Sequence, residues 1–66
     1  MKLWVNGGER SLEAVANVAG LVAALGLDGR KVAVERNLEI VPRSTYGATP
    51  LSEGDRIEIV HFIGGG

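Results

Sequence analysis

The sequence contains 66 residues, with seven basic and eight acidic side chains that leave a formal net charge of −1. We expect one small domain at this length and no second one. The basic surface that neutralises phosphates is missing, which argues against a nucleic-acid-binding protein. Cysteine is absent, which excludes disulfides, thiolate metal sites and a cysteine nucleophile supplied by this chain.

No membrane-targeting signal stands out in the sequence. The first six residues lack the apolar run and the small-residue cleavage site of a secretory signal. No apolar stretch approaches the roughly 20 residues that a membrane-spanning helix needs. A cytoplasmic location without membrane contact is therefore expected.

The N-terminal residues have the pattern of a β-hairpin. Leu3 and Val5 alternate with polar or outward-facing neighbours, which predicts a strand over residues 2–5. The Asn-Gly-Gly sequence at residues 6–8 is a strong turn signal, so a second, antiparallel strand is expected over residues 9–13.

One helix is expected over residues 18–25. Its apolar positions recur at spacings of three, four and seven residues: Val18, Leu21, Val22 and Leu25. Asn17 is a suitable N-cap and Gly26 a suitable residue to end the helix. Gly20 inside the helix costs about 1 kcal/mol relative to alanine, unless the helix approaches the sheet closely there.

Alternation returns in residues 31–36, where Val32 and Val34 share one face of a predicted third strand. Asn37 marks a turn, which Arg36 is also expected to serve. A short return strand through residues 40–41 follows.

The last third of the sequence contains a short helical turn and the final strand. Pro42 can open a single helical turn through Tyr46, and residues 47–54 are expected to be irregular. The final strand is predicted over residues 56–62. The resulting order is an α+β arrangement, in which a right-handed connection makes the first and last strands parallel neighbours. It matches the β-grasp fold of ubiquitin-like proteins, a mixed sheet of four to five strands with one helix on one face.

Three glycines end the sequence: Gly64, Gly65 and Gly66. We expect residues 1–63 to form a single β-grasp domain and residues 64–66 a flexible tail. Glycine loses the most conformational entropy on ordering, so it belongs where backbone must pass through a narrow space. An enzyme that activates a terminal carboxylate as an acyl-adenylate needs such access. The alternative interpretation is a terminal remnant with no role.

Three segments resemble the ThiS family of sulfur carriers in thiamine biosynthesis. They are Val-Ala-Val-Glu-Arg-Asn at residues 32–37, Ile-Val-Pro-Arg at residues 40–43 and the block from Gly54 to Gly66. The resemblance covers the whole chain, although only the C-terminal block is specific. It implies a carrier with no catalytic residues, no metal and no bound cofactor.

The resemblance also implies a reaction sequence on the tail. An adenylyltransferase of the ubiquitin-activating type would use ATP and magnesium to adenylate Gly66. Sulfur from a cysteine desulfurase or another donor would convert the carboxylate into a thiocarboxylate. Thiazole synthase would take that sulfur into the thiazole moiety of thiamine. Gly64 and Gly65 would let the tail thread into the partners' active sites.

The final strand is expected to present an apolar surface to a partner. Period-two alternation places Ile57 and Ile59 toward the helix. Val60 and Phe62 then lie on the open face, where an exposed apolar cluster usually has a partner. The alternatives are a covering loop or a break in the alternation near the end of the strand. Trp4 is expected on the same face, because it is out of phase with its inward-facing neighbours. The predicted partner-binding residues are Trp4, Val60, Phe62 and Ile63.

The remaining polar residues carry weaker signals. His61 has no second metal ligand at a suitable spacing, so a partly buried structural histidine or an interface residue is expected. Glu53 and Asp55 flank a glycine and indicate a turn and not a catalytic pair. Arg43 is expected on the solvated surface, with contact to a partner as the alternative. Tyr46 is expected as a cap on the core.

Two alternatives to a carrier for thiazole synthesis stay open. Another ubiquitin-like sulfur carrier, for molybdopterin synthesis or tRNA thiolation, differs only in length and in the C-terminal block. A plain β-grasp interaction module would have no tail chemistry at all.

Overall fold

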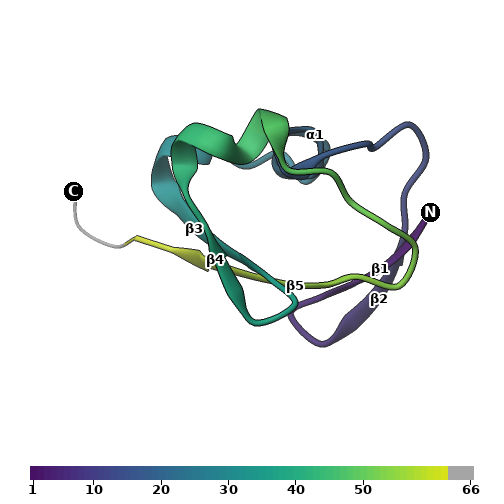
Figure 1. Cartoon of the computed structure of the whole chain (residues 1–66). Helices are drawn as coiled ribbons and strands as arrows, with labels where there is room; N and C mark the ends of the chain where they lie inside the picture. The colour runs from purple at the N-terminus through teal and green to yellow at the C-terminus, as the bar shows by residue number, and fades with distance from the viewer. Residues whose placement is uncertain (63–66) are drawn as a thin grey trace.

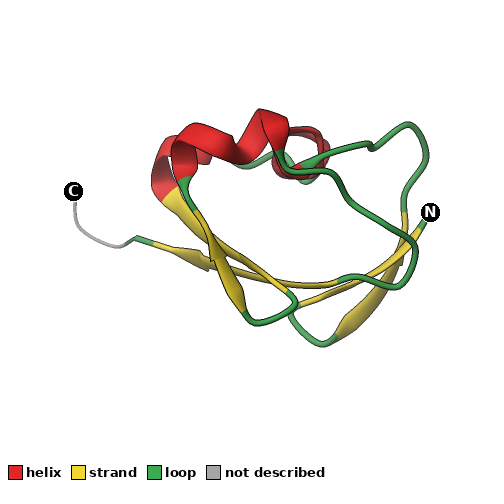
Figure 2. Cartoon of the chain, viewed as in Figure 1, coloured by secondary structure: helices red, strands yellow, loops and turns green. Residues whose placement is uncertain are grey.

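The computed structural model describes residues 1–62 and shows one sheet covered on one face by helical segments (Figures 1 and 2). The strands are β1 (Lys2–Val5), β2 (Gly8–Ser11), β3 (Val32–Arg36), β4 (Glu39–Val41) and β5 (Arg56–His61). The helical segments are α1 (Val18–Ala24) and the 3-10 turns η1 (Gly29–Lys31) and η2 (Arg43–Ala48). The turn η1 was not predicted.

The five strands lie in the order β2-β1-β5-β3-β4. β1 runs parallel to β5, and the other neighbouring pairs are antiparallel. The predicted mixed sheet, with the first and last strands as parallel neighbours and one α-helix on one face, is confirmed. Because β5 is the central strand, its C-terminal end lies in the middle of the sheet and not at an outer strand.

The first hairpin is shorter than predicted. β2 ends at Ser11, although the pattern had indicated a strand through residue 13. Leu12 still donates its backbone N–H to Met1 O at 2.9 Å. Ala14 then has a positive φ of 59°, which turns the chain away from the strand direction and toward α1.

The ends of α1 follow the predicted caps. Asn17 has an extended backbone, and its Oδ1 accepts the N–H of Gly20 at 2.8 Å. The helix ends at Ala24, one residue earlier than predicted, and Gly26, which follows the C-cap Leu25, has a φ of +74°. A close approach of the helix to the sheet does not explain Gly20, because a Cβ there would meet no atom of the sheet within 4 Å. A Cβ at Gly20 would lie 3.3 Å from Asn17 Oδ1, so the glycine leaves room for the cap itself.

The core lies between α1, η2 and the inner face of the sheet. Its most deeply buried large side chains are Leu3, Val18, Leu21, Val32, Val34 and Ile57. Tyr46 on η2 is buried, and its hydroxyl donates to Val32 O at 3.1 Å. The prediction that Tyr46 caps the core is therefore confirmed, and the hydrogen bond satisfies the polar end of the ring.

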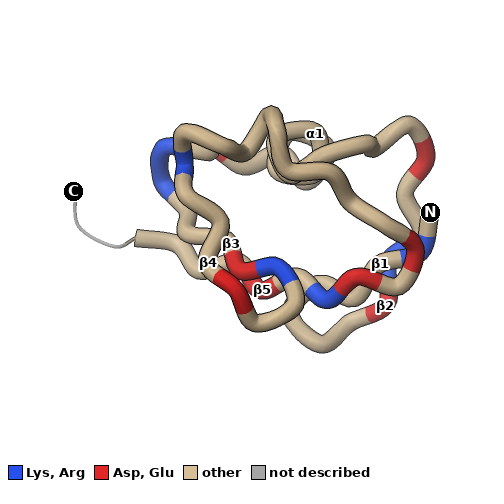
Figure 3. The backbone as a smooth tube through the Cα atoms, in the orientation of Figure 1, with Lys and Arg blue, Asp and Glu red and all other residues tan. Residues whose placement is uncertain are grey.

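Charged side chains lie on the strands and the connecting segments, whereas α1 contains none (Figure 3). The exposed side of α1 is formed mainly by alanine. Surface charge that a partner could recognise is therefore carried by the sheet, the loops and the two 3-10 turns.

Among residues 1–62, no helix has both the length and the apolar character to cross a membrane.

Candidate functional site

The C-terminal end of β5 presents apolar side chains on the open face of the sheet. Val60 is 62% exposed and Phe62 52% exposed, whereas Ile57 and Ile59 point into the core. Ala33 on β3 is also exposed and lies directly opposite Val60 in the register. The predicted faces of the last strand are confirmed. We call the group formed by Ala33, Val60 and Phe62 the β5 patch.

Two contacts hold Phe62 at the end of the patch. Its backbone N–H donates to Lys31 O at 2.9 Å, which continues the pairing of β5 with the segment before β3. The guanidinium carbon of Arg43 lies 5.8 Å from the centre of the Phe62 ring, within cation–π range. Arg43 therefore borders the apolar patch with a positive charge, and the contact with a partner stays a prediction.

Trp4 shares the open face but lies away from the β5 patch. It is half-buried and pairs with Arg56 in the register, and the Arg56 guanidinium carbon lies 5.8 Å from its ring. Val60 is four residues further along β5, a distance of about 13 Å at the usual rise of a strand. The charged Glu58 points to the same face between them. Trp4 and the β5 patch are therefore two separate apolar contacts.

Asp55 connects the start of β5 to the turn between β3 and β4. Its carboxylate accepts hydrogen bonds from Arg36 Nε at 2.9 Å, Asn37 Nδ2 at 3.0 Å and Ser52 N at 2.8 Å. Burial by itself raises the pKa of Asp55, but the bonds from these three partners outweigh it and hold the pKa below its ordinary value. The sequence had predicted one turn around Asp55 and another at Asn37, but no contact between the two.

The sequence matches the model of the ThiS family over residues 3–66, nearly its whole length. This chain belongs to the ThiS family. The sulfur carrier protein ThiS of Bacillus subtilis is 45% identical over 49 residues, which cover 74% of each chain. The crystal structure of the thiamine biosynthesis protein ThiS from Geobacter metallireducens superposes with a TM-score of 0.84 at 38% identity and covers all of both chains.

Two relatives of this ThiS family member are longer proteins. The thiazole synthase of Paramagnetospirillum magneticum is 58% identical over all 66 residues, and that of Magnetococcus marinus is 53% identical. The chain spans 20% of the length of each of these relatives. Each of these two thiazole synthases therefore contains a ThiS-like segment within one longer polypeptide.

Several predicted site residues of this ThiS chain lie outside the described residues. They are Ile63, Gly64, Gly65 and Gly66. Within residues 1–62, no cluster of three or more His, Asp or Glu side chains could hold a metal ion. His61 is exposed on the helix side of β5, so the alternative of a partly buried structural histidine was wrong, and the alternative of an interface residue stays a prediction.

Replacing Asp55 with Asn in this ThiS chain should lower the free energy of unfolding by about 1.5 kcal/mol at pH 7, because an amide cannot replace both acceptor oxygens. The folded-state pKa of Asp55 is lowered, so its contribution is complete above the unfolded-state pKa of about 3.9. The contribution is lost as the pH falls from there through the folded-state pKa. Urea denaturation at pH 7 and near pH 2.5 should show the two proteins converging in acid.

Asp28→Asn provides the matched control for that experiment. Asp28 forms an ion pair with Arg30 at 3.0 Å, and the hydrogen bond from Arg30 lowers the pKa of Asp28 to about 2. The Arg30 side chain is 84% exposed, so solvent screens the pair and a much smaller loss of stability is expected. Equal losses for the two variants would contradict the structural role of Asp55.

Proposed function

We propose that this chain is a sulfur carrier of thiamine biosynthesis, a protein substrate and not an enzyme. Membership of the ThiS family supports this function, as does the similarity to the Bacillus subtilis sulfur carrier. The structural observation that carries the proposal is the position of the β5 patch. Only Phe62 and Ile63 lie between the end of β5 and Gly64, so a protein that binds the patch lies close to the tail.

The chemistry would take place at the carboxylate of Gly66. A carboxylate oxygen attacks the α-phosphorus of ATP, pyrophosphate leaves, and an acyl-adenylate forms. Hydrosulfide or an equivalent sulfur nucleophile then attacks the carbonyl carbon and displaces AMP, which leaves a thiocarboxylate. Gly64 and Gly65 carry no side chain that would obstruct either attack. ATP and magnesium would be bound by the partner enzyme.

Three kinds of protein would act on this carrier. An adenylyltransferase of the ubiquitin-activating type would activate the tail, a cysteine desulfurase or another donor would supply the sulfur, and thiazole synthase would receive it. The two thiazole synthases that contain a ThiS-like segment support the last partner. They also favour the thiamine route over a carrier for molybdopterin synthesis or tRNA thiolation.

The β5 patch would be the docking surface for these proteins. A bound partner buries Val60 and Phe62 and thereby removes exposed apolar area from water. Arg43 at the edge of the patch would add a charged contact. Because the patch and the tail belong to one continuous segment, docking on the patch would direct the glycines toward the partner's active site.

Incubation with the cognate adenylyltransferase, ATP, magnesium and sulfide should convert the chain that ends at Gly66 into its thiocarboxylate. Intact-mass spectrometry should show a gain equal to the difference in mass between one sulfur and one oxygen atom. Fragmentation should place this gain on Gly66.

The control reaction omits ATP and should leave the mass unchanged. A second control confirms that the same enzyme preparation forms pyrophosphate with an established carrier protein. An unchanged mass under those active conditions would refute the proposed function.

A further inference from the structure

The edge of β5 that faces β1 is only partly covered. The last register pair of the two strands is Val5 with Ile57. The chain then turns at Asn6, whose φ is 50°, and leaves β5. The Asn6 side chain continues the pairing, because its Oδ1 accepts from Ile59 N at 2.7 Å and its Nδ2 donates to Ile59 O at 3.2 Å. Asn6 thus ends the β1–β5 ladder with a side-chain amide in place of a strand.

The next backbone groups on this edge belong to His61. Ile57 O and Ile59 N and O all bond toward β1, whereas Phe62 N bonds toward β3. Because successive residues of a strand direct their backbone groups to opposite sides, the N–H and C=O of His61 face the side of β1. Within residues 1–62, no strand lies beyond Asn6 on the edge of β5 that faces β1. This leaves one donor and one acceptor available to an added strand.

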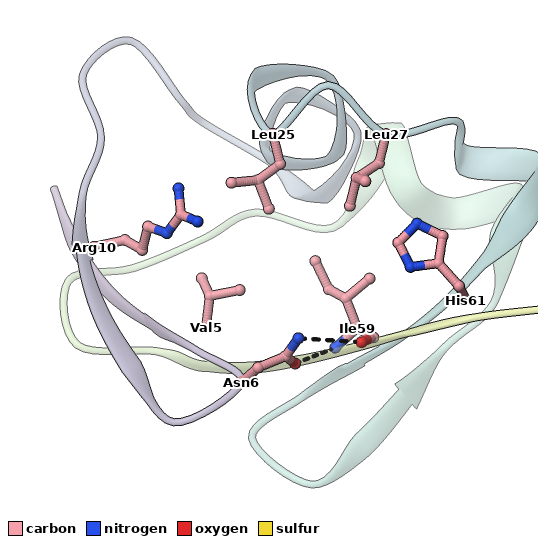
Figure 4. Close-up of a pocket in the computed structure, with 7 residues that line it drawn as sticks. All are labelled: Val5, Asn6, Arg10, Leu25, Leu27, Ile59 and His61. Atoms are coloured by element: carbon pink, nitrogen blue, oxygen red, sulfur yellow. Dashed lines mark hydrogen bonds between the residues drawn. The ribbon is translucent and has the colours of Figure 1, made fainter.

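A shallow groove of about 190 Å³ lies beside this free edge, between the sheet and the end of α1 (Figure 4). Four apolar side chains form its walls: Val5, Leu25, Leu27 and Ile59. Figure 4 places Arg10 at one end of the groove and His61 at the other. No Asp or Glu lines it, and Arg10 forms no ion pair within the described part of the chain. The groove therefore suits an apolar segment that carries a carboxylate.

We propose that an extended segment of thiazole synthase binds in this groove, pairs with the backbone of His61 and directs an acidic side chain to Arg10. The proposal rests on the proposed function, which supplies thiazole synthase as a partner. Strand addition at a free edge uses main-chain hydrogen bonds for affinity and alternate side chains for specificity. With the β5 patch on one face of β5 and the groove on the other, the partner would hold both sides of the strand that leads to the tail.

Hydrogen exchange and binding measurements with thiazole synthase test the proposal. In the complex, the amide of His61 should exchange at least about tenfold more slowly than in the free chain, because it becomes hydrogen-bonded. Leu21 in α1, already bonded to Asn17 O, provides the internal reference. Arg10→Glu should weaken binding about tenfold, with a smaller loss for Arg10→Gln. Arg30→Glu is the matched control, since Arg30 is exposed and lies outside the groove.

The outcomes separate this inference from the proposed function. Binding that protects the β5 patch without slowing His61 exchange, or that is equally tight for Arg10→Glu, would overturn the strand addition and leave the carrier function standing. No binding to thiazole synthase at all would overturn both. The melting curves of the Arg10 variants should match that of the wild type, since Arg10 lies on the exposed strand β2, and this match would exclude unfolding as the cause of a loss of binding.

Discussion

Removal of Gly66 is expected to lower the rate of sulfur transfer at least about 100-fold while the melting temperature stays unchanged. Each extended residue contributes about 3.5 Å of reach, so the new terminal carboxylate would lie one residue short of the reacting position. A misplacement of even about 1 Å can cost about 100-fold in rate. The core that the structure describes extends from Leu3 to Ile59, so the last residue is not expected to stabilise it. Thiazole formation and thermal melting should be measured on the same preparations.

Gly65→Ala tests the same idea without shortening the tail. The added methyl group should obstruct passage through a narrow channel and lower transfer strongly. Gly47→Ala is the matched control, because Gly47 is exposed and a Cβ there would meet no atom within 4 Å. The control should preserve both transfer and stability. A clear drop in melting temperature for either tail variant would instead mean that the tail packs against the domain.

Phe62→Ala should weaken binding to the adenylyltransferase and to thiazole synthase. Aromatic anchors at the centre of an interface commonly contribute ~2 kcal/mol or more, which corresponds to a loss of ~30-fold in affinity. Because Phe62 is 52% exposed in the free chain, its removal should cost little stability beyond the contact with Arg43. Titration calorimetry of each enzyme with the wild type and the variant measures the effect.

Leu38→Ala provides the matched control for Phe62→Ala. Leu38 is 90% exposed, but it lies in the turn between β3 and β4, beside Asn37, whose N–H bonds to Arg56 O at the start of β5. It is therefore at the opposite end of β5 from Phe62, and its truncation should leave affinity unchanged. Equal affinities for wild type and Phe62→Ala would mean that the β5 patch is not the docking surface.

Most of the fold could be predicted from local patterns in the sequence. The alternation in β5 predicts that Ile57 and Ile59 lie on one face and Val60 on the other. In the structure the first two side chains are buried and Val60 is exposed. Asn17 and Gly26 bound the helix as predicted, because a cap bonds to backbone only a few residues away. Such features depend on neighbours in the chain, so a single sequence displays them. The chemistry proposed for Gly66 likewise rests on residue type at the end of the sequence, and its placement lies outside the described residues.

Features that join distant segments were decided only by the tertiary structure. Asp55 meets Arg36 and Asn37 across 19 and 18 residues, and Asn6 meets Ile59 across 53. No local period encodes these bonds, because they depend on the register in which the strands pair. The same register ends β1 beside Ile57, places Asn6 beside Ile59 and leaves the His61 edge free, next to a groove between sheet and helix. The sequence alone determined which residues face outward on β5, whereas the sheet determined which backbone groups remain available beside them.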